Sequence, residues 1–430
     1  MNGKIKGIHK NELAKNTVWM LIGFGFRILI QAGYFVVLAR MLGADGFGSF
    51  VGVAALVMIA AQFSGLGTGN LLVKNVARNP KAFEVYWGNS LVITLLSSLL
   101  LIPLVLLVSS IILPGNISSL FVLLIAAADI IFLRVNENAA QAFQAFQKLS
   151  WTAFTNVQIS TIKMIAAVGI MLMVKEPQVM DWGYAYLLCS IISAVISVVL
   201  VHTKLGKPRV HLAIMKPELK EGLYFAVGGA SLGAYNETDK SLLTKLSSLE
   251  AAGIYGAANR IIDVTFTPIR SLLFAAYAKF FQHGEKGIKN SFQFTIKLLP
   301  LSTGYGIICG ACIFLFAPIM PLVLGADFEA SVEAVRWLSI VPLLKSFHYF
   351  AADSLTGAGY QGFRSLAQIG AAVVSIGLNM FLIPMLAWKG AAITAIITNT
   401  VLSMTMWTGI LYLTRKKDQP VPEASASKSY

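Results

Sequence analysis

Long apolar runs alternate with short polar segments along the whole of this 430-residue chain. A helix that crosses a bilayer needs about 20 mostly apolar residues. The runs are continuous rather than apolar at every second position, so they predict helices and not the strands of a membrane barrel. Twelve spans are expected, at residues 16–38, 48–69, 88–112, 117–137, 151–174, 183–203, 222–245, 252–278, 292–316, 334–358, 364–386 and 390–413.

The longest polar stretch between these runs covers residues 203–221 and divides the spans into six and six. A motif of base, acid, glycine and aromatic residue follows the first span of each half, at Arg40–Phe50 and again at Lys245–Tyr255. An even number of spans starts both halves on the same side, which predicts parallel repeats about an axis along the membrane normal. The expected fold is therefore all-α and polytopic, with two six-helix lobes, residues 1–213 and 214–430, around a central cavity that carries the substrate path.

The positive charges sort by side of the membrane. Of the 34 Lys and Arg residues, 22 fall on one side of the membrane, in loops or at span ends, 5 fall on the other side and 7 lie in the interior of spans. Cytoplasmic loops retain Lys and Arg, so both termini are expected in the cytoplasm. The first apolar run is too long for the core of a cleavable signal peptide and predicts a permanent helix. The polar tail after Leu413 is expected to be disordered.

Composition excludes several classes of protein. Only 13% of residues are charged, whereas a soluble domain averages about 25%. The net charge of +14 is spread over loops without a compact basic domain, so it indicates topology and contact with lipid headgroups rather than nucleic-acid binding. The pair Cys309 and Cys312 lacks further metal ligands. The glycine pattern at 357–362 lacks the strand of a dinucleotide site. No enzyme and no cofactor are expected.

Ionisable residues near mid-membrane depth are the candidates for function, because each costs about 2.5–3.5 kcal/mol unless it faces a cavity or a partner. The pair Glu237 and Lys240 and the pair Arg260 and Asp263 are each three residues apart, so each pair shares a helix face. Arg134 and Glu137 have the same spacing at a helix end. The mid-depth residues are Arg27, Asp129, Lys163, Glu237, Asp239, Lys240, Arg260, Asp263, Arg270, Lys345 and Asp353.

Several of the mid-span cations come from different helices, and Arg27, Lys163 and Lys345 have no acidic residue within four positions. A cavity lined by such cations suits an anionic ligand, since Arg and Lys both bind phosphate oxygens. Ion pairing across helices is the structural alternative. From depth, the expected cavity cations are Arg27, Lys163, Lys240 and Lys345, and the acids that could hold a coupling proton or sodium ion are Glu237, Asp239 and Asp263.

The chain also resembles a known family. Ala39-Arg-Met-Leu-Gly-Ala-Asp-Gly-Phe-Gly-Ser-Phe50, with Asn16–Trp19 before it, is similar to the start of polysaccharide-exporting flippases. These are O-antigen and teichuronic-type members of the multidrug/oligosaccharidyl-lipid/polysaccharide exporter superfamily. Asp239–Ile261 resembles their seventh-to-eighth helix segment, and Gly377–Ala392 resembles their eleventh-to-twelfth helix hairpin. Twelve spans, without the two extra helices of the lipid II branch, favour the oligosaccharide branch.

The resemblance implies a flippase that carries an undecaprenyl-diphosphate-linked oligosaccharide from the cytoplasmic to the outer leaflet by alternating access. By position it implies that Arg27 and Arg260 bind the diphosphate and glycan. The expected place is the bacterial inner membrane, with polysaccharide polymerase and glycosyltransferase machinery as partners. Two alternatives stay open: a cation-coupled drug or metabolite exporter of the same superfamily, and a non-transporting scaffold of a polysaccharide assembly complex.

Overall fold

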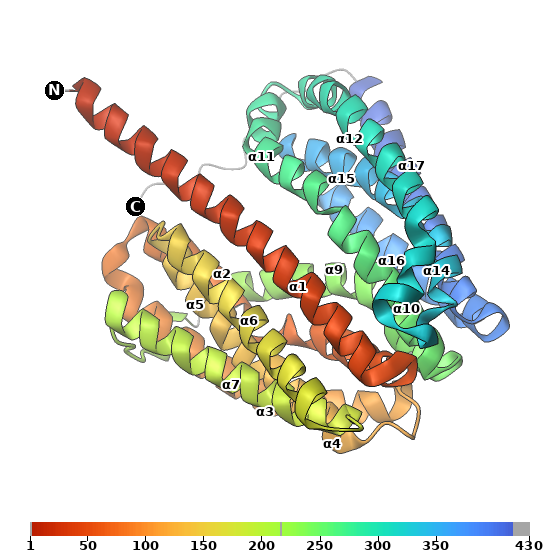
Figure 1. The fold of residues 1–430 in the computed structure, drawn as a ribbon. Helices are drawn as coiled ribbons and strands as arrows, with labels where there is room; N and C mark the ends of the chain where they lie inside the picture. The colour runs from red at the N-terminus through yellow and green to blue at the C-terminus, as the bar shows by residue number, and fades with distance from the viewer. Residues whose placement is uncertain (1, 216, 416–430) are drawn as a thin grey trace. The chain divides into compact units, whose positions relative to one another are not determined.

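The computed structural model describes the backbone of residues 2–215 and 217–415 (Figure 1). Side chains are described from residue 29 onward, except at 77, 78, 224, 228, 229, 231, 232, 234, 235, 271, 274, 275, 277, 278, 281 and 282. The described residues form helices joined by short turns, without a strand. The α-helices are α1 Asn2–Ala61, α2 Thr68–Arg78, α3 Phe83–Ile112, α4 Ser119–Ala127, α5 Arg134–Ala145, α6 Leu149–Met173, α7 Val179–Lys204, α8 Leu212–Met215, α9 Leu219–Leu246, α10 Leu249–Thr265, α11 Thr267–Gly284, α12 Ile288–Phe316, α13 Met320–Leu324, α14 Ser331–Leu338, α15 Val341–Gly357, α16 Gln361–Leu386 and α17 Trp388–Arg415.

All twelve expected spans are helical, but their ends differ from the prediction. The first span and most of the second form one continuous stretch, α1, in which the chain turns at Gly43 with a φ of 65°. The end of the second span lies in η1 Ser64–Gly67 and the start of α2. The fourth span is made of α4, the π-helical turn η3 Ala128–Leu133 and α5. The eighth is divided into α10 and α11, and the tenth into α14 and α15. The expected disordered tail lies outside the described residues from 416 onward.

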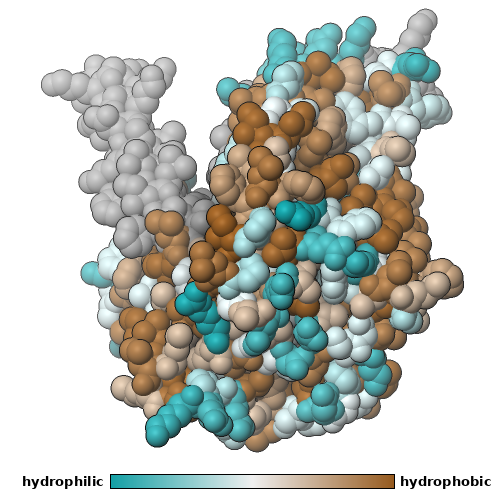
Figure 2. All heavy atoms as spheres, turned by 45° about the vertical axis from the view of Figure 1, so that its right-hand side comes forward, coloured by the Kyte–Doolittle hydropathy of each residue, from teal (hydrophilic) through white to brown (hydrophobic). Residues whose placement is uncertain are grey.

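Eight helical stretches of the described chain are long and apolar enough to cross a membrane. Their surfaces fit this placement. On α3, Leu99, Leu100 and Leu107 are 70%, 77% and 63% exposed. Such side chains would be costly in water and are stable against lipid tails. Figure 2 shows apolar side chains over broad areas of the face that it draws. The predicted all-α, polytopic membrane fold is confirmed.

The chain divides into two compact units, Met1–Lys245 and Leu246–Tyr430. The division falls after α9, whereas the sequence predicted a boundary after residue 213. Polar contacts explain why α9 belongs with the first unit. Lys74 of α2 pairs with Glu221 at 2.6 Å, and Glu218, just before α9, accepts hydrogen bonds from Asn75 and from Tyr86 of α3.

A close approach of two backbones fixes the start of α9 in the first unit. Gly67 ends the 3-10 turn η1 Ser64–Gly67 with a φ of 72°, a conformation that favours glycine. A Cβ at position 67 would collide with the backbone of Gly222, so a side chain would push α9 away from α2.

Replacing Gly67 by alanine is therefore expected to destabilise the protein by about 2–4 kcal/mol, the sum of left-handed strain and overpacking. Thermal unfolding of the purified protein measures the effect. Gly115→Ala is the matched control, because a Cβ there meets nothing within 4 Å. Equal unfolding temperatures for the two variants would contradict the packing described.

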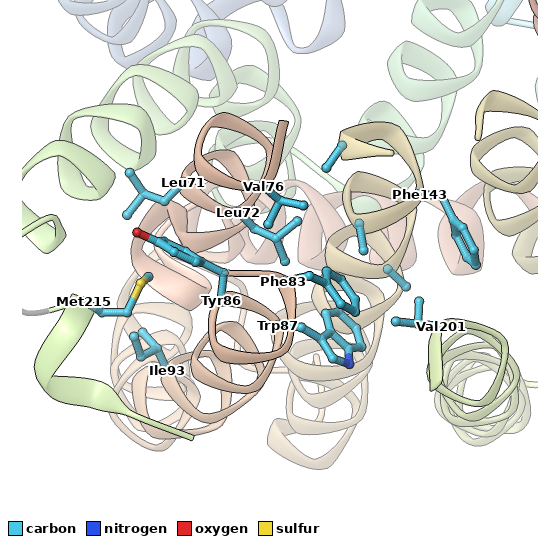
Figure 3. Close-up of a cluster of buried hydrophobic side chains, with 13 residues drawn as sticks. Leu71, Leu72, Val76, Phe83, Tyr86, Trp87, Ile93, Phe143, Val201 and Met215 are labelled. Atoms are coloured by element: carbon cyan, nitrogen blue, oxygen red, sulfur yellow. The ribbon is translucent and has the colours of Figure 1, made fainter. Parts of the chain in front are cut away.

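An apolar core holds α2 and α3 against α5, α7 and α8 at one end of the first unit (Figure 3). The buried face of α2 is formed by Leu71, Leu72 and Val76, which recur at helical spacing. Phe83 stacks on Trp87 at a centroid distance of 6.4 Å, and Phe143 of α5 joins the same cluster. This core fixes the polar ends of α2 and α5 relative to each other.

The second unit has its own core, which is built around α11 and α15. Phe280 of α11 lies against Phe294 of α12 and Phe350 of α15, with ring centroids 5.1 Å and 6.4 Å apart. Helix α17 packs against both α15 and α16. The long helices of this unit thereby hold α15, which carries two of the buried ionisable residues.

Candidate functional site

The first unit holds a buried cluster of one acid, one base and one tyrosine. Tyr186 of α7 donates a hydrogen bond to Asp129 Oδ1 at 2.9 Å. The Lys163 ammonium lies 3.4 Å from the centre of the Tyr186 ring, as in a cation–π contact. Asp129, Lys163 and Tyr186 are only 5%, 8% and 7% exposed. Three separate helical elements thus bring two opposite charges to one tyrosine inside the lobe.

Asp129 sits in the π-helical turn η3, between α4 and α5. A π-turn inserts a residue into a helix and changes the direction in which nearby side chains point, and such turns are frequent at functional sites. Aromatic rings also shield the cluster, because Trp182 and Phe50 pack on Tyr186 with ring centroids 5.8 Å and 5.4 Å away. Low polarity strengthens the attraction between Asp129 and Lys163. It also makes an uncompensated charge there expensive.

Helix α9 carries a second group of charges. Lys240 Nζ lies 2.7 Å from Glu237 Oε2, and both side chains are largely buried, at 12% and 18% exposure. Asp239 accepts a hydrogen bond from the backbone N–H of Lys240 at 2.8 Å. The predicted pairing of Glu237 with Lys240 is confirmed. The charges of α9 therefore partly neutralise one another within the helix.

In the second unit, Lys345 of α15 forms an ion pair with Asp263 of α10, Nζ to Oδ1 3.2 Å. Lys345 is 12% exposed, and Asp263 is 38% exposed. Lys345 was expected to have a cavity role or a partner on another helix, and the structure supplies that partner. Arg260 lies one turn before Asp263 on α10 and is half-buried. Arg260, Asp263 and Lys345 thus lie close together on two helices.

A further buried pair joins α15 to α16. Arg364 donates a hydrogen bond to Asp353 at 3.2 Å and another to Thr356 at 2.8 Å. The sequence placed Asp353 at mid-depth but assigned Arg364 to a basic loop, so this pair was not foreseen. The expected pair of Arg134 with Glu137 is confirmed at 2.7 Å.

The structure shows which partners most of the expected site residues contact. Lys163, Lys240 and Lys345 each meet an acid or its hydrogen-bond partner, and Glu237 and Asp263 are two of those acids. Arg27 lies in α1, but its side chain is outside the described residues. Asp129 and Tyr186 were not among the expected site residues. The signal for Asp129 was its mid-membrane depth, whereas nothing in the sequence marks Tyr186. In the described part of the chain, no group of three or more His, Cys, Asp or Glu side chains could hold a metal ion.

A family profile described as "Polysaccharide biosynthesis protein" matches residues 13–278, which is more than half of the chain. The chain belongs to this polysaccharide biosynthesis family. The matched region contains the buried cluster of the first unit, the charges of α9 and the Arg260–Asp263 segment. No curated protein sequence matches the chain.

Solved structures show the same fold at low sequence identity. An inward-facing multidrug resistance MATE transporter of the MOP superfamily aligns with a TM-score of 0.73 and 16% identity, over 91% of this chain and 96% of that one. An outward-facing structure of such a transporter gives 0.64 and 16%, over 94% and 96%. A MOP-superfamily transporter from Pyrococcus furiosus, described as having a binding pocket of reversed polarity, gives a TM-score of 0.54 and 15% identity, over 94% of this chain and 96% of that one. The chain therefore has the fold of MOP-superfamily transporters, and its helices are those of a multi-pass membrane protein.

Proposed function

We propose that the protein flips an undecaprenyl-diphosphate-linked oligosaccharide from the cytoplasmic to the outer leaflet by alternating access. The observation that carries this proposal is the family match over residues 13–278, which joins polysaccharide biosynthesis to a transporter fold. A lipid-linked saccharide has a polar, doubly anionic head that cannot cross hydrocarbon unaided. Cations within the spans supply what such a head needs.

The proposed substrate contacts are Arg27, Lys240, Arg260 and Lys345. At rest Lys240 and Lys345 are paired with Glu237 and Asp263, so their charges are already compensated. A diphosphate can replace a carboxylate as the partner of a Lys or Arg, so that the cation stays paired. The released acid then becomes free to take up a proton or a sodium ion, which gives Glu237, Asp239 and Asp263 their proposed coupling role.

Lys163 has a different proposed role, because it is more buried than Lys240 and Lys345, at 8% exposure. Its charge balances Asp129 across the Tyr186 ring in the first unit. A change in the protonation of Asp129 would alter that balance and the packing of η3, α6 and α7. We therefore propose that Lys163 affects substrate transfer through this cluster and not by contact with the substrate. The proposed location is the bacterial inner membrane, with both termini in the cytoplasm and with polymerase and glycosyltransferase machinery as partners.

The test is to measure how lipid-linked saccharides divide between the leaflets in cells depleted of this protein. An impermeant reagent labels saccharides on the outer leaflet only. Depletion is expected to leave the lipid-linked saccharide unlabelled on the cytoplasmic leaflet, and the wild-type protein is expected to restore labelling. An unchanged distribution in a strain without other flippases would reject the proposal. Efflux of an organic cation by the same protein would then favour the small-molecule exporter.

A further inference from the structure

A small polar pocket lies in the first unit where α2 begins, apart from the buried charge cluster. It is partly open and has a cavity volume of about 40 Å³, which is room for roughly three water molecules at about 10–15 Å³ each. Two helix ends and the start of α9 form its wall. The polar lining residues are Gln62, Ser64, Thr68, Asn70, Arg134, Asn138 and Gln141.

Two buried groups that line this pocket have no hydrogen-bond partner among the described residues. They are the Thr68 hydroxyl and Nε of Arg134. Thr68 is only 1% exposed, so its hydroxyl has given up water without gaining a bond inside the protein. An unmet buried polar group lowers stability, and structures rarely retain one without a use. Both residues line the pocket, so a ligand bound there would lie beside these two unpartnered groups.

The charge of the pocket argues against an anion. Among the described lining residues only Arg134 is charged, and its guanidinium already binds Glu137 at 2.7 Å and the carbonyl of Ala61 at 2.5 Å. The pocket therefore has no surplus positive charge. Burying an anion without one costs more than the remaining hydrogen bonds return.

The lining suits hydroxyl groups instead. Each hydroxyl both donates and accepts a hydrogen bond, and the amides of Asn70, Asn138 and Gln141 offer both functions. Phe225 of α9 also lines the pocket and is 45% exposed, so its ring can cover the apolar C–H face of a sugar. Because the pocket is small, it matches the hydroxyl edge of one sugar residue and not a whole oligosaccharide.

We infer that this pocket binds one sugar residue of the saccharide that the protein moves. The inference rests on the proposed function and adds a specificity site to it. The pocket lies at the ends of the expected spans 48–69 and 117–137, beside α2 and the turn that follows it, which together carry Lys74, Arg78 and Lys81. That is the basic, cytoplasmic side by the sequence prediction, where a saccharide awaiting transfer would hang from its lipid.

The test measures protection of a thiol at the pocket rim by the saccharide that the cell itself makes. Asn70 is exposed, and Asn70→Cys is introduced into the full chain together with Cys309→Ala and Cys312→Ala. Maleimide labelling is then followed in membranes from cells with complete lipid-linked saccharide and from cells blocked at the first glycosyl transfer, which hold only undecaprenyl phosphates. Labelling is expected to be slower in the first membranes alone.

Two further substitutions separate recognition from folding. Thr68→Val removes the unpartnered hydroxyl and keeps the shape of the side chain, so it should leave abundance unchanged. It is expected to weaken saccharide binding by about 2- to 10-fold, the value of one hydrogen bond, and to reduce the protection accordingly. Thr398→Val is the matched control. Thr398 is also 1% exposed with an unpartnered hydroxyl, but it lies on α17 outside this pocket.

The outcomes are distinct. Protection that needs the saccharide and falls with Thr68→Val but not with Thr398→Val supports the inference. Equal protection by undecaprenyl phosphates alone would identify an anion or lipid-headgroup site and overturn it. Absence of protection would also overturn it, and so would identical behaviour of the two threonine variants. The leaflet distribution is measured in the same cells, so protection without an effect on the leaflets would reject the proposed function and leave the sugar site standing.

Discussion

Replacing Lys163 by methionine is expected to destabilise the first unit by about 3–5 kcal/mol, the cost of removing one partner from a buried pair of charges. The methionine fills similar space but leaves Asp129 uncompensated beside Tyr186. Asp129→Asn should be costly for the opposite reason, since it leaves the Lys163 charge buried. Combining the two changes removes both charges and is expected to recover most of the loss, which appears as a large coupling energy in a double-mutant cycle.

Membrane abundance and the unfolding temperature of the purified protein measure this cycle. Lys389→Met is a matched control, because Lys389 pairs with Glu333 at 2.8 Å but both side chains are about half exposed, at 43% and 52%. An exposed pair contributes about 0–1 kcal/mol. Single variants of Lys163 and Asp129 as mild as this control would contradict the cluster. A stable double variant that exports saccharide normally would restrict the cluster to a role in folding.

Replacing Arg260 by alanine is expected to reduce saccharide export by about 10- to 150-fold, the range for one charge-assisted hydrogen bond to phosphate. Arg260 is half-buried beside the Asp263–Lys345 pair, and that pair remains in the variant. Abundance should therefore change little. Arg260→Lys keeps the charge but loses bidentate geometry, so it is expected to retain part of the activity.

Labelling of outer-leaflet saccharide measures this effect, and Arg27→Ala is expected to behave in the same way. The control is Arg336→Ala, since Arg336 is an exposed residue of α14 with no proposed part in transport. Normal export by both Arg27→Ala and Arg260→Ala would remove them from the substrate site. Equal losses of export in Arg27→Ala, Arg260→Ala and Arg336→Ala would show that removing any positive charge lowers export, whatever its position.

The fold could be predicted from the sequence because the membrane restricts the choices. Continuous apolar runs of spanning length can only be helices, and every expected span is helical. What could not be predicted is how those runs are divided. The glycine that turns α1 at residue 43 and the π-helical turn at 128–133 do not change the apolar pattern. The place of α9 in the first unit depends on Glu218 and Glu221, whose partners are about 130–150 residues away.

The candidate site was predictable only where partners share a helix. The Glu237–Lys240 pair follows from a spacing of three residues. Asp263 has a base at that spacing, Arg260, but the structure also brings Lys345 to it from 82 residues away. The contact of Asp129 with Tyr186 spans 57 residues and depends on how η3 and α7 pack. Mid-membrane charge therefore marked most of the charged residues that form buried pairs, and tertiary packing decided which of them meet.

The most direct test of the central claim is transfer of lipid-linked saccharide by the purified protein in proteoliposomes. The substrate is extracted from cells of the source strain, and an impermeant reagent that modifies the saccharide reports the fraction in the outer leaflet over time. We predict that wild-type protein makes the inner pool accessible, that Arg336→Ala matches it and that Arg260→Ala is at least about tenfold slower. Transfer no faster than in protein-free liposomes, with folded protein and either a proton or a sodium gradient, would contradict the account.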